Sequence, residues 1–269
     1  MTPSSERNVD PQVGGSRGGV VGTPPLLEVS RLRKAFGGIK AVDAVDLTLA
    51  LGELRALIGP NGAGKTTFFN LLTGHLAPDA GSVRFRGERV DGLAPHRIWH
   101  RGLARTFQIP AVFPNLTVVE NVQVALQSGR HRTLSLRGRG RDLERERAGS
   151  ILDRVGLGSH GGRPAGVLPY GDLKKLELGI ALASEPALLL LDEPAAGMAP
   201  AERRELMALV EAIARQSGLT LLFTEHDMDV VFAVADRITV LHQGRVIAEG
   251  RPEAVRADPE VQRVYLGEL

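Results

Sequence analysis

The residues with the clearest chemical meaning form one continuous loop that is rich in glycine and ends in a lysine and two threonines. They fit the pattern G-x-x-x-x-G-K-[ST], which is typical of loops that bind nucleotide phosphates. The nine residues are Gly59, Pro60, Asn61, Gly62, Ala63, Gly64, Lys65, Thr66 and Thr67. Glycines let the backbone wrap tightly and point its N–H groups inward, and the N-terminus of a following helix completes the anion cradle. Lys65 would contact the β- and γ-phosphates of ATP, and the Thr66 hydroxyl would coordinate Mg²⁺.

Two adjacent carboxylates form the second candidate group. Asp192 and Glu193 directly follow an apolar run of four leucines, Leu188 to Leu191. Asp192 is placed to hold Mg²⁺ through water, and Glu193 is placed to orient and polarise the attacking water as a general base. Alternatively, acids after a strand only cap the next helix. The phosphate loop in the same chain favours the catalytic interpretation.

These side chains meet only if the strands before them end at one edge of a sheet. Apolar runs predict buried strands over residues 54–59, 188–191, 219–223 and 238–241. Helical patterns follow them, as in residues 202–215. This alternation predicts an α/β fold, a P-loop NTPase core with a mostly parallel sheet. Strand-like patterning from residue 26, with a short strand at Val83 and Phe85, predicts an N-terminal antiparallel β part.

The remaining segments suggest the domain organisation. Residues 1–25 are rich in Gly, Ser and Pro, and we expect a disordered tail. Residues 26–269 would form one domain, with a helical subdomain inserted at about residues 109–183, where no comparable buried strand occurs. Within it, residues 128–149 hold seven arginines among several acids. A solvated loop leading into a helix is the favoured interpretation, and a contact with lipid head groups or a partner's loop is the alternative.

Composition excludes several classes of protein. The chain has 33 basic and 31 acidic residues, which argues against a dedicated nucleic-acid binder. Cysteine is absent, so disulfides and thiolate metal sites are excluded. No stretch approaches the roughly 18 apolar residues that cross a bilayer, and no signal peptide is visible. We therefore expect a cytoplasmic protein that reaches a membrane only through a partner.

With these motifs in order, the chain resembles the ATP-binding subunits of ABC transporters over about residues 26–269. The resemblance implies that Gln108 is the glutamine that links Mg²⁺ and the attacking water to the membrane partner. It implies that His226 is the switch histidine that contacts the γ-phosphate. Phe36 lies where an aromatic residue usually stacks on adenine, although a core phenylalanine is equally compatible.

Two motifs depart from the family pattern. The signature is normally Leu-Ser-Gly-Gly-Gln, and here the residues are Leu168, Pro169, Tyr170, Gly171 and Asp172. The serine hydroxyl is missing and Pro169 has no N–H donor, so part of the anion-binding capacity is lost. The resemblance implies that Gly171 serves the nucleotide of a second copy, in trans. Ala199 replaces the usual D-loop aspartate. The resemblance therefore implies ATPase activity but does not predict its rate.

The altered signature and D-loop are similar to those of the ABC importers for branched-chain amino acids, urea and short amides. Residues 113–122 and 258–268 are similar to that branch as well. The resemblance implies transmembrane permease subunits, a second ATP-binding subunit (identical or paralogous) and, indirectly, a solute-binding protein as partners. The chain would sit peripherally on the cytoplasmic face of the membrane. An ATPase of lipopolysaccharide or lipid export is one alternative, and a soluble non-transport ABC ATPase is another. A small GTPase is disfavoured because no Asn-Lys-x-Asp motif occurs.

Overall fold

The computed structural model describes residues 24–106, 112–129 and 139–266. The predicted tail therefore lies outside the described residues except for its last two, and so does Gln108. Among the described residues, no helix is both long and apolar enough to cross a membrane.

A six-stranded sheet forms the centre of the protein, in the order β10-β9-β3-β8-β7-β6. Its strands are β3 (Leu54–Ile58), β6 (Leu103–Arg105), β7 (Leu188–Asp192), β8 (Thr220–Thr224), β9 (Arg237–His242) and β10 (Arg245–Gly250). All neighbouring pairs are parallel except β9 with β10. Every residue of β3, β7 and β8 is buried, which explains their continuous apolar character. The short edge strand β6 was not among the strands predicted from sequence.

A second sheet is antiparallel and comes from the N-terminal part of the chain. Its order is β2-β1-β4-β5, formed by β1 (Leu27–Phe36), β2 (Ile39–Leu49), β4 (Ala80–Phe85) and β5 (Glu88–Arg89). Buried Leu27 and Val29 alternate with more exposed residues on β1, as expected of a sheet with one solvated face. Both sheets therefore have the arrangement predicted from the sequence.

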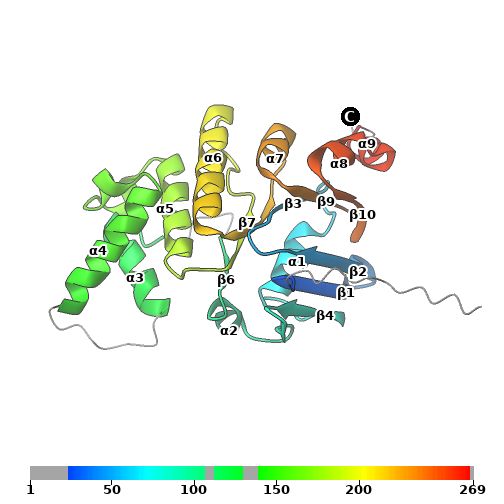
Figure 1. Cartoon of the computed structure of the whole chain (residues 1–269), viewed down its shortest axis with the longest axis horizontal. Coiled ribbons are helices and arrows are strands. Elements are labelled where there is room, and N and C mark those ends of the chain that lie inside the picture. Colours follow the sequence, from blue (N-terminus) through cyan, green and yellow to red (C-terminus); the bar gives the residue numbers. More distant parts are fainter. Residues whose placement is uncertain (1–23, 107–111, 130–138, 267–269) are drawn as a thin grey trace, which may run out of the picture.

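Helices complete the fold. They are α1 (Lys65–Leu72), α2 (Pro95–Trp99), α3 (Val118–Gly129), α4 (Arg139–Arg154), α5 (Tyr170–Leu182), α6 (Pro200–Ser217), α7 (Met228–Val234), α8 (Pro252–Ala257) and α9 (Pro259–Leu266). Figure 1 shows α3, α4 and α5 grouped at one end of the molecule, with α5 nearest to α6. These three helices lie in the chain between β6 and β7, and the described residues there contain no strand of either sheet.

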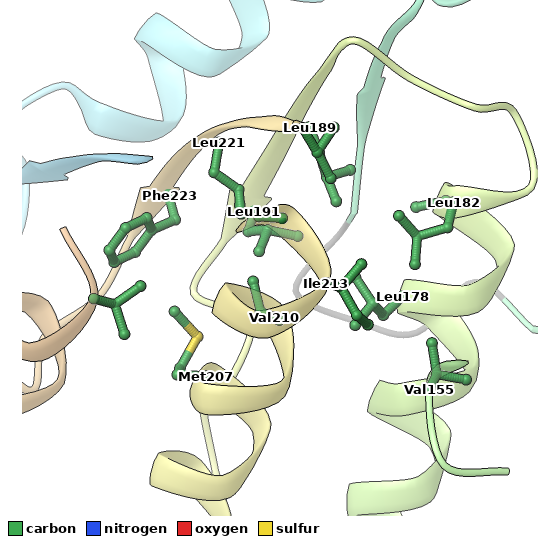
Figure 2. Packing of buried hydrophobic residues seen from close by; sticks show 14 of the residues in the cluster. Val155, Leu178, Leu182, Leu189, Leu191, Met207, Val210, Ile213, Leu221 and Phe223 are labelled. Atoms are coloured by element: carbon green, nitrogen blue, oxygen red, sulfur yellow. The ribbon is translucent and has the colours of Figure 1, made fainter. Parts of the chain in front are cut away.

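The central sheet separates two hydrophobic cores. On β7, Leu188 and Leu190 face the core shared with α1 and the antiparallel sheet, whereas Leu189 and Leu191 face the core shared with α5 and α6. Successive side chains of a strand point to opposite faces, so one leucine run serves both layers. Figure 2 shows the second core, in which side chains of β7 and β8 meet those of α6 and α5. This packing fixes the end of β7, where Asp192 lies.

Asp236 joins the carboxyl end of α6 to the start of β3. It accepts the Leu54 N–H at 2.8 Å and two N–H groups of Arg215 at 2.9 and 2.7 Å. Partial burial acts to raise the pKa of Asp236, but the hydrogen bonds from Arg215 and Leu54 outweigh it and leave the pKa lowered. The ionised carboxylate therefore stabilises the fold.

Replacing Asp236 with alanine should lower the free energy of unfolding at neutral pH by about 1 kcal/mol, after allowance for solvent screening. Because the folded-state pKa is lowered, this contribution is complete above the unfolded pKa of about 3.9 and is lost as the pH falls through the folded value. Urea denaturation from pH 7 down to pH 4 and below should show the two proteins converging. Arg263→Ala, at an exposed pair with Glu260 3.7 Å away, is the control and should change almost nothing. A difference that grows on acidification would contradict the assignment.

Candidate nucleotide-binding site

The glycine-rich loop connects β3 to α1 and is wedged between two other strands. A Cβ atom on Gly59 would collide with the carbonyl oxygen of Leu241 in β9, and one on Gly64 would collide with that of Ala41 in β2. Gly64 also has a φ of 105°, a conformation that favours glycine. Both glycines are therefore required by close backbone approach, and they hold the loop in its tight course.

Lys65 lies inside this loop. Its ammonium group donates hydrogen bonds to the carbonyl oxygens of Gly59 at 2.6 Å and Pro60 at 3.1 Å, and only 7% of the residue is exposed. Burial lowers the pKa of Lys65, and the carboxylates of Glu193 and Asp192 oppose that shift. A lysine held in this way is preorganised for an anion that enters the loop, because an incoming phosphate offsets its desolvation.

Asp192 and Glu193 are organised by a threonine on the neighbouring strand. Asp192 pairs in register with Thr224 across β7 and β8. The Thr224 hydroxyl donates to Asp192 Oδ1 at 3.0 Å and accepts the N–H of Glu193 at 2.9 Å. Glu193 has a φ of 50°, a left-handed conformation that costs about 1–3 kcal/mol and is often found at functional sites. Glu193 Oε1 lies 2.8 Å from His226 Nε2.

A buried arginine completes the surroundings of Asp192. Arg105, the last residue of β6, donates to Asp192 Oδ2 at 2.7 Å and to Asn70 Oδ1 on α1 at 2.7 Å. Its guanidinium carbon lies 5.6 Å from the ring centroid of Phe69. The side chains of Arg105 and Asp192 are only 7% and 4% exposed. This ion pair therefore links the edge strand, the acid at the end of β7 and the helix that follows the phosphate loop.

Arg105→Ala should lower the free energy of unfolding by about 3 kcal/mol, because removing one partner of a buried ion pair leaves the other charge uncompensated. Chemical denaturation measures this loss. Adding Asp192→Asn to Arg105→Ala should cost much less than the sum of the two single changes, since the two groups interact directly. Arg101→Ala removes an exposed pair with Glu88 at 3.3 Å and serves as the control, with a change below about 0.5 kcal/mol. A loss for Arg105→Ala as small as this control would contradict the pairing.

Glu225 contacts the backbone near both Glu193 and His226. Its carboxylate accepts the N–H groups of Ala195 at 3.3 Å and of His226 at 3.1 Å. Burial raises the pKa of Glu225, and these N–H groups act against the shift. Glu225 thus joins the segment after Glu193 to the segment that carries His226.

The structure brings together only some of the residues predicted from sequence. Lys65, Asp192, Glu193 and His226 all lie at the carboxyl edge of the parallel sheet, after β3, β7 and β8. Phe36 is 46% exposed at the end of β1, so its interpretation as a core residue is wrong and the adenine contact stays a prediction. Gly171 lies elsewhere, in the first turn of α5. Gln108 falls outside the described residues, as does much of the arginine-rich segment.

Sequence reasoning missed Arg105, Thr224 and Glu225. The first two were visible only as polar residues at the ends of short runs, with no spacing that ties them to Asp192. Glu225, beside His226, carried no motif of its own. Their roles depend on strand order and not on local pattern.

A phosphate loop after a central parallel strand, acids at the end of β7 and a histidine after β8 are the arrangement of an ATP-binding cassette. The family model described as ABC transporter matches residues 42–196, and one described as branched-chain amino acid ATP-binding cassette transporter matches residues 245–268. The chain belongs to the ABC transporter family and is an ATPase of that family.

Its relatives in sequence include proteins of the predicted branch of that family. LivG of Escherichia coli K12, described as a high-affinity branched-chain amino acid transport ATP-binding protein, is 43% identical over 252 residues, which are 91% of this chain and 98% of LivG. BraF of Pseudomonas aeruginosa has the same description and is 41% identical over the same shares of the two chains. The predicted resemblance is confirmed.

Solved structures agree on the fold. A nucleotide-free ATP-binding cassette from an ABC transporter is 32% identical, with a TM-score of 0.78 over 90% of this chain and 98% of that one. An ATP-binding cassette of an ABC transporter in its ADP conformation is 33% identical, with a TM-score of 0.80 over 91% of this chain and 100% of that one. These likenesses confirm the predicted fold class and an ATP-binding role.

Proposed function

We propose that this chain is the ATP-hydrolysing subunit of an importer for a small polar solute, with branched-chain amino acids, related amides or urea as the substrate class. The observation that carries the ATP-hydrolysing role is the contact of Glu193 with His226 at 2.8 Å, beside the loop that holds Lys65. The similarity to LivG and BraF, which are described as branched-chain amino acid transport proteins, supports the substrate class.

The residues of the phosphate loop bind the nucleotide in this proposal. Backbone N–H groups of residues 61–67 surround the phosphates, and Lys65 exchanges its two carbonyl contacts for the β- and γ-phosphate oxygens. Phe36 stacks on the adenine. The exposure of Phe36 leaves its ring available for this contact.

The oxygen donors present fit magnesium. Mg²⁺ usually takes one or two protein oxygens together with phosphates and water, and the described residues contain no larger group of His, Cys, Asp or Glu able to hold a metal ion. The Thr66 hydroxyl and the Asp192 carboxylate would hold it, with Gln108 as a further ligand. When bound, the ion neutralises charge on the phosphates. Thr224 and Arg105 keep the Asp192 carboxylate in one orientation.

Glu193 acts as the general base toward the attacking water, and His226 holds that carboxylate and contacts the γ-phosphate. The Thr224 hydroxyl supports the backbone N–H of Glu193, so the strained residue keeps its position while the proton moves to its carboxylate. Preorganisation of this kind accounts for much of the rate of phosphoryl transfer.

The complete site needs a second ATP-binding subunit, identical or paralogous, that supplies Gly171 in trans. The permease subunits receive the conformational change that accompanies ATP hydrolysis. A solute-binding protein delivers the substrate to them. The chain then sits peripherally at the cytoplasmic face of the membrane. The similarity to two branched-chain amino acid transport ATP-binding proteins over 91% of this chain disfavours lipopolysaccharide export and a soluble non-transport role.

Purification of the chain from its own cells in mild detergent, followed by identification of the co-purifying subunits, tests the proposal. We expect permease subunits and a second ATP-binding subunit, and release from membranes when the permease gene is deleted. A ligand screen on the associated solute-binding protein then identifies the substrate. Recovery with an exporter's permease, or with no membrane protein, would overturn the proposed import function.

A further inference from the structure

The loop that carries the altered signature touches the loop that follows Glu193 in the same chain. The Tyr170 hydroxyl donates a hydrogen bond to the carbonyl oxygen of Ala196 at 3.1 Å. A Cβ placed on Gly197 would lie 3.8 Å from the Tyr170 ring, and one placed on Gly171 would lie 3.5 Å from the Met198 methyl group. Tyr170 is therefore hydrogen-bonded to this loop, and Gly171 lies next to Met198.

Residues 195–199 are firmly attached to the catalytic edge of the sheet. The Ala195 N–H donates to Glu225 at 3.3 Å, and Arg203 donates to the Met198 carbonyl oxygen at 3.4 Å and to Asp227 at 3.0 Å. Ala195 and Met198 are buried together with Leu206. Glu225, which also accepts the N–H of His226 at 3.1 Å, therefore links residues 195–199 to the segment that carries His226.

Tyr170 replaces a glycine of the usual signature, and a glycine has no side chain with which to reach Ala196. The tyrosine begins α5, with Pro169 at the N-cap, so its backbone is set by the helix start. Its ring also lies 5.7 Å from Lys174 Nζ. Although 43% of Tyr170 is exposed, its hydroxyl is directed to one backbone oxygen.

We propose that Tyr170 is a positioning residue that ties the signature loop (residues 168–172) to residues 195–199 of its own chain. The position from which Gly171 serves the partner's nucleotide then depends on the Glu193–His226 site of the same chain. This inference rests on the proposed function, in which Gly171 acts in trans.

Tyr170→Phe tests it, because the change keeps the ring and removes only the hydroxyl. One hydrogen bond corresponds to a factor of roughly 3–10. In the assembled transporter we expect kcat to fall by about that factor with KM for ATP nearly unchanged. In the isolated full chain, hydrogen exchange of peptides covering residues 194–199 should quicken by a similar factor, while peptides covering residues 59–67 stay unchanged. The Ala196 and Met198 N–H groups close turns within this loop, so they report its opening.

Val167→Ala, at a 71% exposed residue just before the signature loop, is the control and should change neither quantity. Unchanged exchange at residues 194–199 in Tyr170→Phe would overturn the contact, and unchanged kcat with quickened exchange would overturn the coupling. Hydrogen exchange needs neither nucleotide nor permease. If the wild-type protein showed no ATPase activity, the proposed function would fail while the contact itself was still tested.

Discussion

Glu193→Gln should leave ATP binding intact and reduce ATP turnover by about 10²–10⁴-fold, the usual contribution of a general base. Glutamine keeps the shape of the side chain and can still hydrogen-bond His226, but it cannot accept a proton from the attacking water. The left-handed backbone at Glu193, with a φ of 50°, is no harder for glutamine to adopt, so folding should be unaffected. The ATP-bound form should accumulate as a dimer, because the γ-phosphate is not removed.

Phosphate release by the assembled transporter measures this loss, and calorimetric titration of the full chain measures ATP binding. Size-exclusion chromatography with ATP and magnesium reports the dimer. Glu211→Gln, at a partly exposed position on α6 paired with Arg215 at 3.6 Å, is the matched control and should keep wild-type turnover. If turnover persisted in Glu193→Gln, another group would have to serve as the base.

Lys65→Met should weaken ATP binding by about 10–100-fold, because a charge-assisted hydrogen bond contributes about 1.5–3 kcal/mol. Methionine retains most of the buried aliphatic length, so the space inside the loop stays filled. The wild-type ammonium group already lies 2.6 Å from the Gly59 carbonyl oxygen, within the turn that would surround the phosphates. Binding of adenosine, which lacks phosphates, should not change.

Titrations with ATP, ADP and adenosine separate the contribution of the phosphates from that of the nucleoside. The difference in affinity between variant and wild type should shrink in that order. Lys40→Met is the control, since Lys40 is an exposed lysine that pairs with Asp43 at 3.5 Å. An equal loss of affinity for adenosine would mean that the substitution damaged the loop as a whole. Normal affinity for ATP would remove Lys65 from the binding site.

The local motifs of this protein could be predicted from sequence because their residues are continuous in the chain. The phosphate loop needs glycines and a lysine at fixed spacing, and the structure adds that Gly59 and Gly64 are also required by contacts with β9 and β2. The leucine run before Asp192 indicated a strand buried on both faces, since only a central parallel strand is apolar at every position. The fold class followed from the alternation of such strands with helices.

The partners of these residues could not be predicted in the same way. Arg105 and Asp192 are 87 positions apart, Thr224 and Asp192 are 32 apart, and Tyr170 and Ala196 are 26 apart. Each pair depends on which strands or loops become neighbours. No local sequence pattern predicts the strand order β8-β7-β6. The chain by itself therefore determined that a nucleotide loop and a pair of acids exist. Only the tertiary structure decided what holds them, because packing across the sheet brings distant segments together.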